Sequence, residues 1–170
     1  MRPTNAGTSG LAIADGASMA HEKILVAFDF GPLAEPLLVW SAEIARRLEG
    51  TVSVLHVVFI PPVASPPMAV GPMYPAQGQI ESLRRKLQEI ATGLRIEAPI
   101  EIQVAGHVGD AIIGAAESQR ADLIAMGTHG GGLIARAFLG SVADYVVRHA
   151  NCPVITMRAA PSNSPMSATT

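Results

Sequence analysis

The chain has 170 residues, of which 49% are hydrophobic and 15% are charged. This length and composition suit one domain with a large core and argue against an intrinsically disordered chain. A net charge of −2, without a Lys/Arg-rich stripe, argues against nucleic acid as the main partner.

The hydrophobic pattern predicts strands and helices in alternation. Residues 1–20 are rich in small residues without periodicity, so we expect a disordered extension there, and another in the Ser/Pro/Thr-rich tail at 159–170. The domain between them is expected at 21–158. Its five predicted strands are Lys23–Asp29, Thr51–Phe59, Ile100–Ala105, Asp122–Met126 and Pro153–Met157. The four predicted helices alternate with them: one from Pro32 to about Glu49, one around Ile80–Leu94, one carrying Ile112 and Ala116, and one from Ser141 to about His149.

Five strands that alternate with four helices predict an α/β fold. The expected architecture is a five-stranded parallel sheet with helices on both faces, an open three-layer, Rossmann-like sandwich. Ligands of such sheets bind beyond the carboxyl ends of the strands, where the strand order reverses. We expect the first and fourth strands to flank this point. Asp29 ends the first strand and Gly127 follows the fourth, so both residues predict the same crevice.

The expected location is the cytoplasm. Cys152 is the single cysteine, which rules out an internal disulfide and a multi-thiolate metal site and is typical of a reducing compartment. The first 20 residues lack a signal-peptide pattern, and the longest apolar stretch, Val52–Ile60, is too short to cross a bilayer, so we expect no membrane association. For Cys152 itself, inert burial is favoured over catalysis.

The segment from Gly127 to Ser141 carries the clearest functional signal. It follows a buried strand and precedes a helix, and its glycines let the backbone approach a ligand closely. Gly140-Ser141 opens the last helix, whose first N–H groups have no partner within the helix and attract anions. This arrangement favours phosphate binding over the alternative, a connection without function.

Two familiar phosphate-binding motifs are excluded. A P-loop requires GxxxxGK[ST], and the chain has no lysine after Lys86. The stretch 130–135 matches a dinucleotide fingerprint by chance, since it follows the fourth strand and lacks an acid about 20 residues later. Ser141 and Asp144 fit a capping box, which is the structural alternative to a phosphate contact at Ser141.

The spacing G-x2-G-x9-G-[ST] is met at Gly127, Gly130, Gly140 and Ser141. Here the chain resembles the universal stress protein family, in its ATP-binding branch. Further matching pieces are KILVAFD at 23–29, LHVV at 55–58 and GSVADYVVRHANCPVI at 140–155. The resemblance covers about residues 22–158.

The resemblance implies a nucleotide site, residue by residue. Residues at the end of the first strand would face adenine and ribose, the main chain of the second strand would touch adenine, and the glycine loop would hold the nucleoside and the phosphates. In that order, the implied cofactor-binding residues are Ala27, Phe28, Asp29, Val57, Met126, Gly127, Gly130, Gly140, Ser141 and Val142. A Mg²⁺ ion would bridge phosphate oxygens, because the loop has no lysine to neutralise them.

Several polar residues have structural alternatives. Asp29 is either a cap for the following helix or a ligand contact, and its place opposite the glycine loop favours the ligand. His56 is expected to be a satisfied core histidine and His107 a capping or surface group. For His129 we favour a ring packed under the loop over a phosphate contact. No two of these histidines have a metal-ligand spacing.

The resemblance implies an ATP-binding regulatory protein of the stress response that forms a homodimer through its last strand. We find no Ser-His-Asp set, no suggestive pair of carboxylates and no activated nucleophile, which argues against dedicated catalysis. A slow ATPase and a nucleotide-free interaction protein of the same fold remain as alternatives. A receiver domain, a different interpretation of the same topology, would require paired acids after the first strand, whereas Asp29 stands alone.

Overall fold

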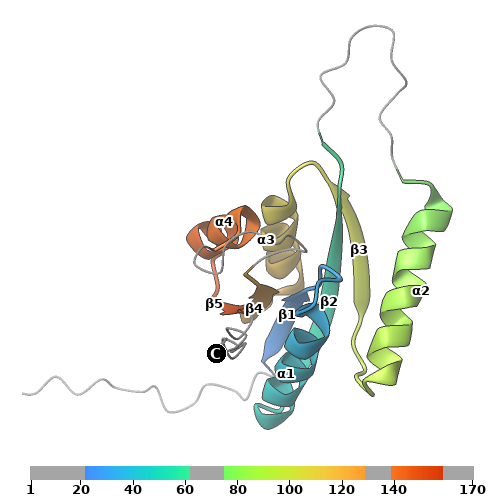
Figure 1. Cartoon of the computed structure of the whole chain (residues 1–170). Helices are drawn as coiled ribbons and strands as arrows, with labels where there is room; N and C mark the ends of the chain where they lie inside the picture. Colours follow the sequence, from blue (N-terminus) through green and yellow to red (C-terminus); the bar gives the residue numbers. More distant parts are fainter. Residues whose placement is uncertain (1–21, 62–74, 129–138, 159–170) are drawn as a thin grey trace, which may run out of the picture.

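The structure, a computed structural model, describes residues 22–61, 75–128 and 139–158. Within these residues, five strands alternate with four helices, as predicted (Figure 1). The elements are β1 (Lys23–Ala27), α1 (Ala34–Arg47), β2 (Thr51–Phe59), α2 (Gln77–Gly93), β3 (Ile100–Ala105), α3 (Val108–Gln119), β4 (Leu123–Gly127), α4 (Ser141–His149) and β5 (Val154–Met157). The extensions expected at 1–20 and 159–170 lie outside the described residues.

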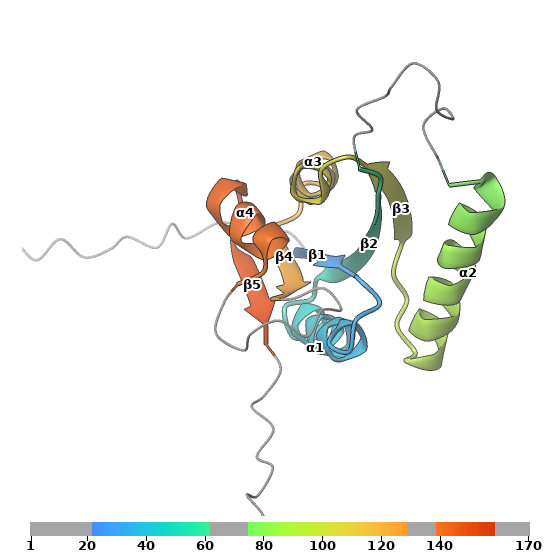
Figure 2. The same cartoon turned by 45° about the horizontal axis from the view of Figure 1, so that its top comes forward.

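The strands form one parallel sheet in the order β3-β2-β1-β4-β5. β1 is therefore central, and its last residue, Ala27, lies opposite Leu55 of β2 and Met126 of β4. α1 and α2 cover one face of the sheet, while α3 and α4 cover the other (Figure 2). This confirms the three-layer fold and places the predicted switch point between β1 and β4.

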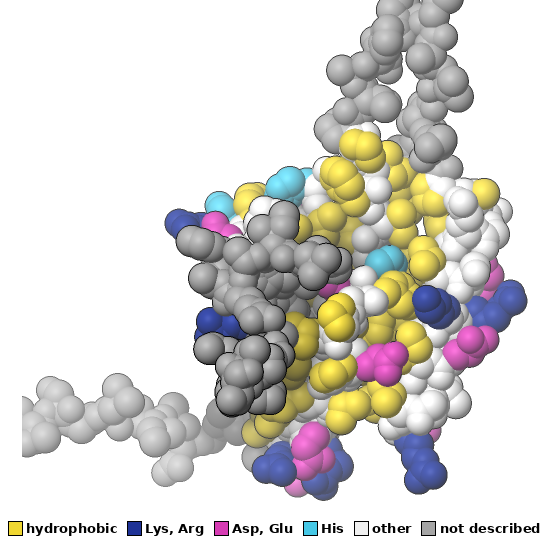
Figure 3. Space-filling view, in the orientation of Figure 1, with side chains coloured by type: hydrophobic (Ala, Val, Ile, Leu, Met, Phe, Trp, Pro, Cys, Tyr) yellow, Lys and Arg dark blue, Asp and Glu magenta, His cyan; other side chains and the backbone are white. Residues whose placement is uncertain are grey.

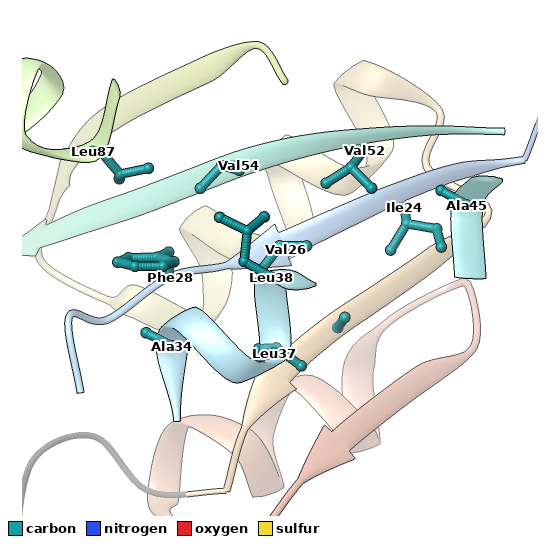
Figure 4. Packing of buried hydrophobic residues seen from close by; sticks show 11 residues of the cluster. Ile24, Val26, Phe28, Ala34, Leu37, Leu38, Ala45, Val52, Val54 and Leu87 are labelled. Carbon is teal, nitrogen blue, oxygen red and sulfur yellow. The ribbon is translucent and has the colours of Figure 1, made fainter. Parts of the chain in front are cut away.

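Each face of the sheet has its own hydrophobic core. Alternate residues of β1 point to the α1 side, where Ile24 lies near Ala45 and Val26 lies near Leu38 (Figure 4). The intervening Leu25 points to the α3–α4 side and packs in the second cluster, which also contains Leu55. Because both faces are buried, β1 and β4 are short and almost wholly apolar, and they form a base for the turns at their carboxyl ends.

The first strand and the first helix are shorter than predicted. β1 ends at Ala27 rather than at Asp29, and α1 begins at Ala34 rather than at Pro32. The cause is a turn in which Phe30 adopts a left-handed backbone, with φ 58°, which neither a strand nor a right-handed helix can continue. The turn lifts Asp29 out of the sheet at the edge where the predicted crevice lies.

The capping box, the structural alternative for Ser141 and Asp144, does not form at the start of α4. The residue before the helix is Gly140, and Ser141 is the first helical residue, without a side-chain capping hydrogen bond. The Asp144 carboxylate instead accepts a hydrogen bond from Arg148 Nε at 2.9 Å, one turn further along the helix. The hydroxyl of Ser141 is therefore not used for capping.

Charged side chains of both signs lie next to one another over α1 and α2 (Figure 3). On α1, Glu43 pairs with Arg46 at 2.9 Å and with Arg47 at 2.8 Å, and on α2, Arg84 lies 3.8 Å from Glu81. Among the helices of the described residues, none combines the length and hydropathy that a membrane span requires.

Candidate functional site

A cavity of about 480 Å³ lies at the carboxyl ends of the central strands. β1, β2 and β4 form its base, α3 contributes one wall, and the N-terminus of α4 contributes another. Side chains from five elements thus meet at the switch point, where α/β sheets of this kind bind ligands. The volume is in the range of small-molecule sites, which span roughly 300–1,000 Å³.

The cavity brings together nine of the ten residues that the sequence assigned to a nucleotide site. The nine lining residues are Ala27, Phe28, Asp29, Val57, Met126, Gly127, Gly140, Ser141 and Val142. The tenth, Gly130, lies outside the described residues, as does His129. Segments far apart in the sequence therefore converge as the predicted topology requires.

The two ends of the segment between β4 and α4 are joined at the cavity. The backbone N–H of Gly140 donates a hydrogen bond to the carbonyl of Thr128 at 2.7 Å. Thr128 in turn donates its own N–H to Met157 O at 2.9 Å, which ties this junction to β5. Gly140 has φ −60° and ψ 155°, a conformation open to any residue, so backbone freedom does not explain a glycine at this position.

The first turn of α4 presents backbone donors to the cavity. The first intrahelical hydrogen bond runs from Asp144 N to Gly140 O, at 2.8 Å. The N–H groups of Ser141, Val142 and Ala143 therefore have no acceptor within the helix, and all three residues line the cavity. Together with the helix dipole, they give this end of the cavity an affinity for anions.

Asp29 also lines the cavity, from the turn that follows β1, and its side chain is exposed. Its Oδ1 accepts a hydrogen bond from the backbone N–H of Gly31 at 2.8 Å, an Asx turn that holds the carboxylate in place. The residue before α1 is Leu33, and no side chain caps that helix. The alternative of Asp29 as a helix cap is therefore wrong, whereas its role as a ligand contact stays a prediction.

His56 has a hydrogen-bond partner, as predicted, but it is half-buried at the cavity rather than in the core. Its Nδ1 lies 2.7 Å from the carbonyl oxygen of Phe28, to which it donates. The ring packs edge-on against Phe30, with centroids 4.8 Å apart, and Lys86 Nζ lies 4.9 Å from the centroid of the Phe30 ring. These contacts fix the turn between β1 and α1 against β2 and α2.

Six further residues, most of them apolar, line the cavity without having been assigned to it from the sequence. They are Leu55, His56, Val108, Ile112, Thr128 and Ala143. Leu55 could have been found, because it precedes Val57 by two residues on the same face of a strand. Val108 and Ile112 are spaced as i and i+4 on one face of α3, but only the packing of that helix reveals which cavity this face lines.

The cavity has apolar walls and few charges. Among the described lining residues, Asp29 supplies the formal negative charge, and neither Lys nor Arg is present. The described residues include no cluster of three or more His, Cys, Asp or Glu side chains that could hold a metal ion. Cys152 lies elsewhere, half-buried, and burial raises the pKa of its thiol, which agrees with the inert role predicted for it.

The fold and the cavity define an α/β protein with a cavity at the switch point of a parallel sheet. Residues 20–158 match the model of the universal stress protein family, and the chain belongs to this family. It is 31% identical over 145 residues to universal stress protein A homolog 1 of Coxiella burnetii, a match that covers 82% of this chain and 97% of the relative.

Solved structures share the fold. The universal stress protein from Archaeoglobus fulgidus is 25% identical, with a TM-score of 0.60 over 81% of this chain and 93% of that one. A structure of the universal stress protein from the same organism in complex with dAMP gives a TM-score of 0.59 at 23% identity, over 83% of this chain and 100% of that one.

Proposed function

We propose that this protein binds an adenine nucleotide, ATP together with Mg²⁺, in the cavity between β1 and β4, and that it acts as a regulatory protein of the cytoplasmic stress response rather than as a dedicated enzyme. The observation that carries the proposal is the convergence of nine predicted residues on one cavity with apolar walls and an anion-attracting helix end. The dAMP complex of the Archaeoglobus fulgidus protein, which has the same fold, supports it.

The two ends of the cavity suit the two ends of a nucleotide. Val57, Met126 and Ile112 offer apolar surface for a flat base. Asp29 can accept hydrogen bonds from ribose hydroxyls or from the base. The phosphates would meet the N–H groups of Ser141 and its neighbours, which have no acceptor within α4.

A divalent ion fits this donor set only through the nucleotide. Since the described residues lack a cluster of metal ligands, Mg²⁺ would be held mainly by phosphate oxygens and water, as is common for this ion. The ion would offset phosphate charge that no Lys or Arg among the described lining residues can neutralise.

Calorimetric titration with ATP and Mg²⁺ tests the proposal. We expect saturable binding by the wild-type protein and its loss in Gly140→Leu, because the side chain would fill the approach between Thr128 and Ser141. Gly114→Leu is the matched control, since a side chain at this helical glycine meets open space and leaves the cavity untouched. Absence of binding by the wild-type protein would reject the proposal, and steady ADP release that Gly140→Leu abolishes would favour a slow ATPase.

We also propose that the protein forms a homodimer through β5. Among the described strands, β5 pairs only with β4, so no described strand pairs with the backbone groups of its outer edge. Ile155 of this strand is 37% exposed, which leaves apolar surface for a second copy to cover.

A further inference from the structure

Tyr145 of α4 packs on the first turn of α3. Its hydroxyl donates a hydrogen bond to Asp110 Oδ1 at 2.7 Å. Its ring lies between two imidazoles, with centroids 4.5 Å from His107 and 4.2 Å from His149, the latter ring nearly parallel to it. The Asp110 carboxylate raises the pKa of Tyr145, so the phenol remains a hydrogen-bond donor at neutral pH.

Gly109 makes this contact possible. It is buried in the first turn of α3, and a Cβ atom at this position would overlap the Tyr145 ring. His107 completes the turn from the other side, since its Nδ1 accepts a hydrogen bond from Asp110 N at 3.2 Å and caps α3. The ring of Tyr145 is thus fitted to a surface that exists only because residue 109 has no side chain.

Both helices that meet at this contact form walls of the cavity. In α3, Val108 precedes Gly109 directly, and Ile112 follows one turn later. In α4, the lining residues end at Ala143, two residues before Tyr145. A change in how Tyr145 sits on Gly109 therefore moves one wall of the cavity relative to the other, without altering any lining side chain.

We propose that Tyr145 is a positioning residue of the nucleotide site: seated on Gly109 and bonded to Asp110, it sets the distance between the wall formed by α3 and the phosphate-facing turn of α4. The inference rests on the proposed nucleotide binding for its effect on affinity. Its structural part, the placement of the two walls, holds for the protein without nucleotide and can be measured there.

The Tyr145→Phe variant removes the hydroxyl and keeps the ring. We expect methyl resonances of Val108 and Val142 to shift in the nucleotide-free protein, and the Kd for ATP with Mg²⁺ to rise about threefold, the lower end of what one hydrogen bond contributes, because this one is exposed. Ser53→Ala is the matched control: it removes a 2.6 Å hydrogen bond from β2 to Gln119, at the other end of α3. This control should leave the Val108 and Val142 resonances and the Kd unchanged.

Gly109→Ala tests the seat itself. We expect it to raise the Kd about tenfold or more in the wild-type background and to have no such effect in the Tyr145→Ala background, where the obstructing ring is gone and Ala is the better helix former. Unshifted Val108 and Val142 methyl resonances in both Tyr145→Phe and Gly109→Ala would overturn the proposal. A wild-type protein that does not bind ATP would reject the proposed function instead, and the methyl resonances would still decide whether Tyr145 places the walls.

Discussion

Asp29 and Gly31 are joined by a 2.8 Å hydrogen bond, from the Gly31 N–H to the Asp29 carboxylate, across a left-handed Phe30. The bond fixes the carboxylate at the mouth of the cavity, where β1 ends. It also explains the glycine, because a Cβ at residue 31 would lie 2.9 Å from Asp29 Oδ1. A short turn thus determines where the acidic group of the site stands.

Asp29→Ala is expected to weaken ATP binding about tenfold, since it removes a charged acceptor worth roughly 1.5 kcal/mol or more. Asp29→Asn keeps an oxygen that can accept the Gly31 N–H, so its affinity for ATP should lie between those of the wild type and Asp29→Ala. The measurement is calorimetric titration with ATP and Mg²⁺. Asp122→Ala is the control, because Asp122 accepts the Lys23 N–H at 2.8 Å at the opposite end of β1. Equal affinity of Asp29→Ala and wild type would contradict a ligand contact.

Ser41→Ala should stabilise the protein by about 0.5–1 kcal/mol. Ser41 is fully buried in α1, and its hydroxyl has no hydrogen-bond partner in the described part of the chain, so the native state bears its desolvation penalty. Urea unfolding measures the effect. Ser118→Ala serves as the comparison, because its Oγ donates to Ala115 O at 3.0 Å and both changes share the helix propensity of alanine. A less stable Ser41→Ala protein would show that the hydroxyl is satisfied.

Glu43 should make stability depend on pH in acid. Hydrogen bonds from Arg46 and then Arg47 lower the pKa of Glu43 from 4.5 to about 2. Because the folded-state pKa is depressed, the contribution is complete above pH 4.5 and is lost as the pH falls toward 2. We expect the stability difference between wild type and Glu43→Gln to shrink over this range, and to be smaller in high salt because the pair is exposed.

The Glu43 prediction is checked by urea unfolding from pH 2 to 7. Glu89→Gln provides the reference, since Glu89 has no ion pair among the described residues and lies on the exposed face of α2. A difference between wild type and Glu43→Gln that stays constant from pH 5 down to pH 2 would show that the arginines do not hold this carboxylate.

Ile155→Lys is expected to convert the proposed dimer into a monomer. A charged side chain on the edge strand β5 would be buried without a partner against a second copy, and lysines on edge strands oppose strand pairing. Light scattering coupled to size-exclusion chromatography gives the mass. Leu48→Lys is the control, because Leu48 is 51% exposed at the end of α1, on another element. A monomeric wild type would contradict the proposed dimer. A dimer that survives Ile155→Lys would show that the two copies meet at another surface.

The sheet could be predicted from the sequence because its signal is local. Thr51–Phe59 and Ile100–Ala105 match β2 and β3 residue for residue, since apolar β-branched runs bounded by turns have few other conformations. The start of α4 at Ser141 was likewise marked by Gly140. Strand alternation then placed Asp29 opposite Gly127, and the structure brings both to one cavity.

Contacts between elements could not be predicted. Nothing local in the sequence indicates that Phe30 has a positive φ, which ends β1 early, because that conformation is stabilised by packing on His56 from another strand. In the same way, the sequence around Gly109 indicates only a glycine at the start of a helix. Its contact with Tyr145, 36 positions later in the chain, is seen only in the structure. Such pairs become visible only when the helices are packed.

The central place of β1 has a consequence for how the protein is made. This strand is synthesised first, yet one of its two neighbours, β4, begins only at Leu123, and the last wall of the cavity is completed by α4 after that. A nascent chain therefore has nothing to offer a nucleotide until nearly all of the domain has emerged. Any ligand that occupies the cavity would select finished molecules and, by mass action, protect them from unfolding.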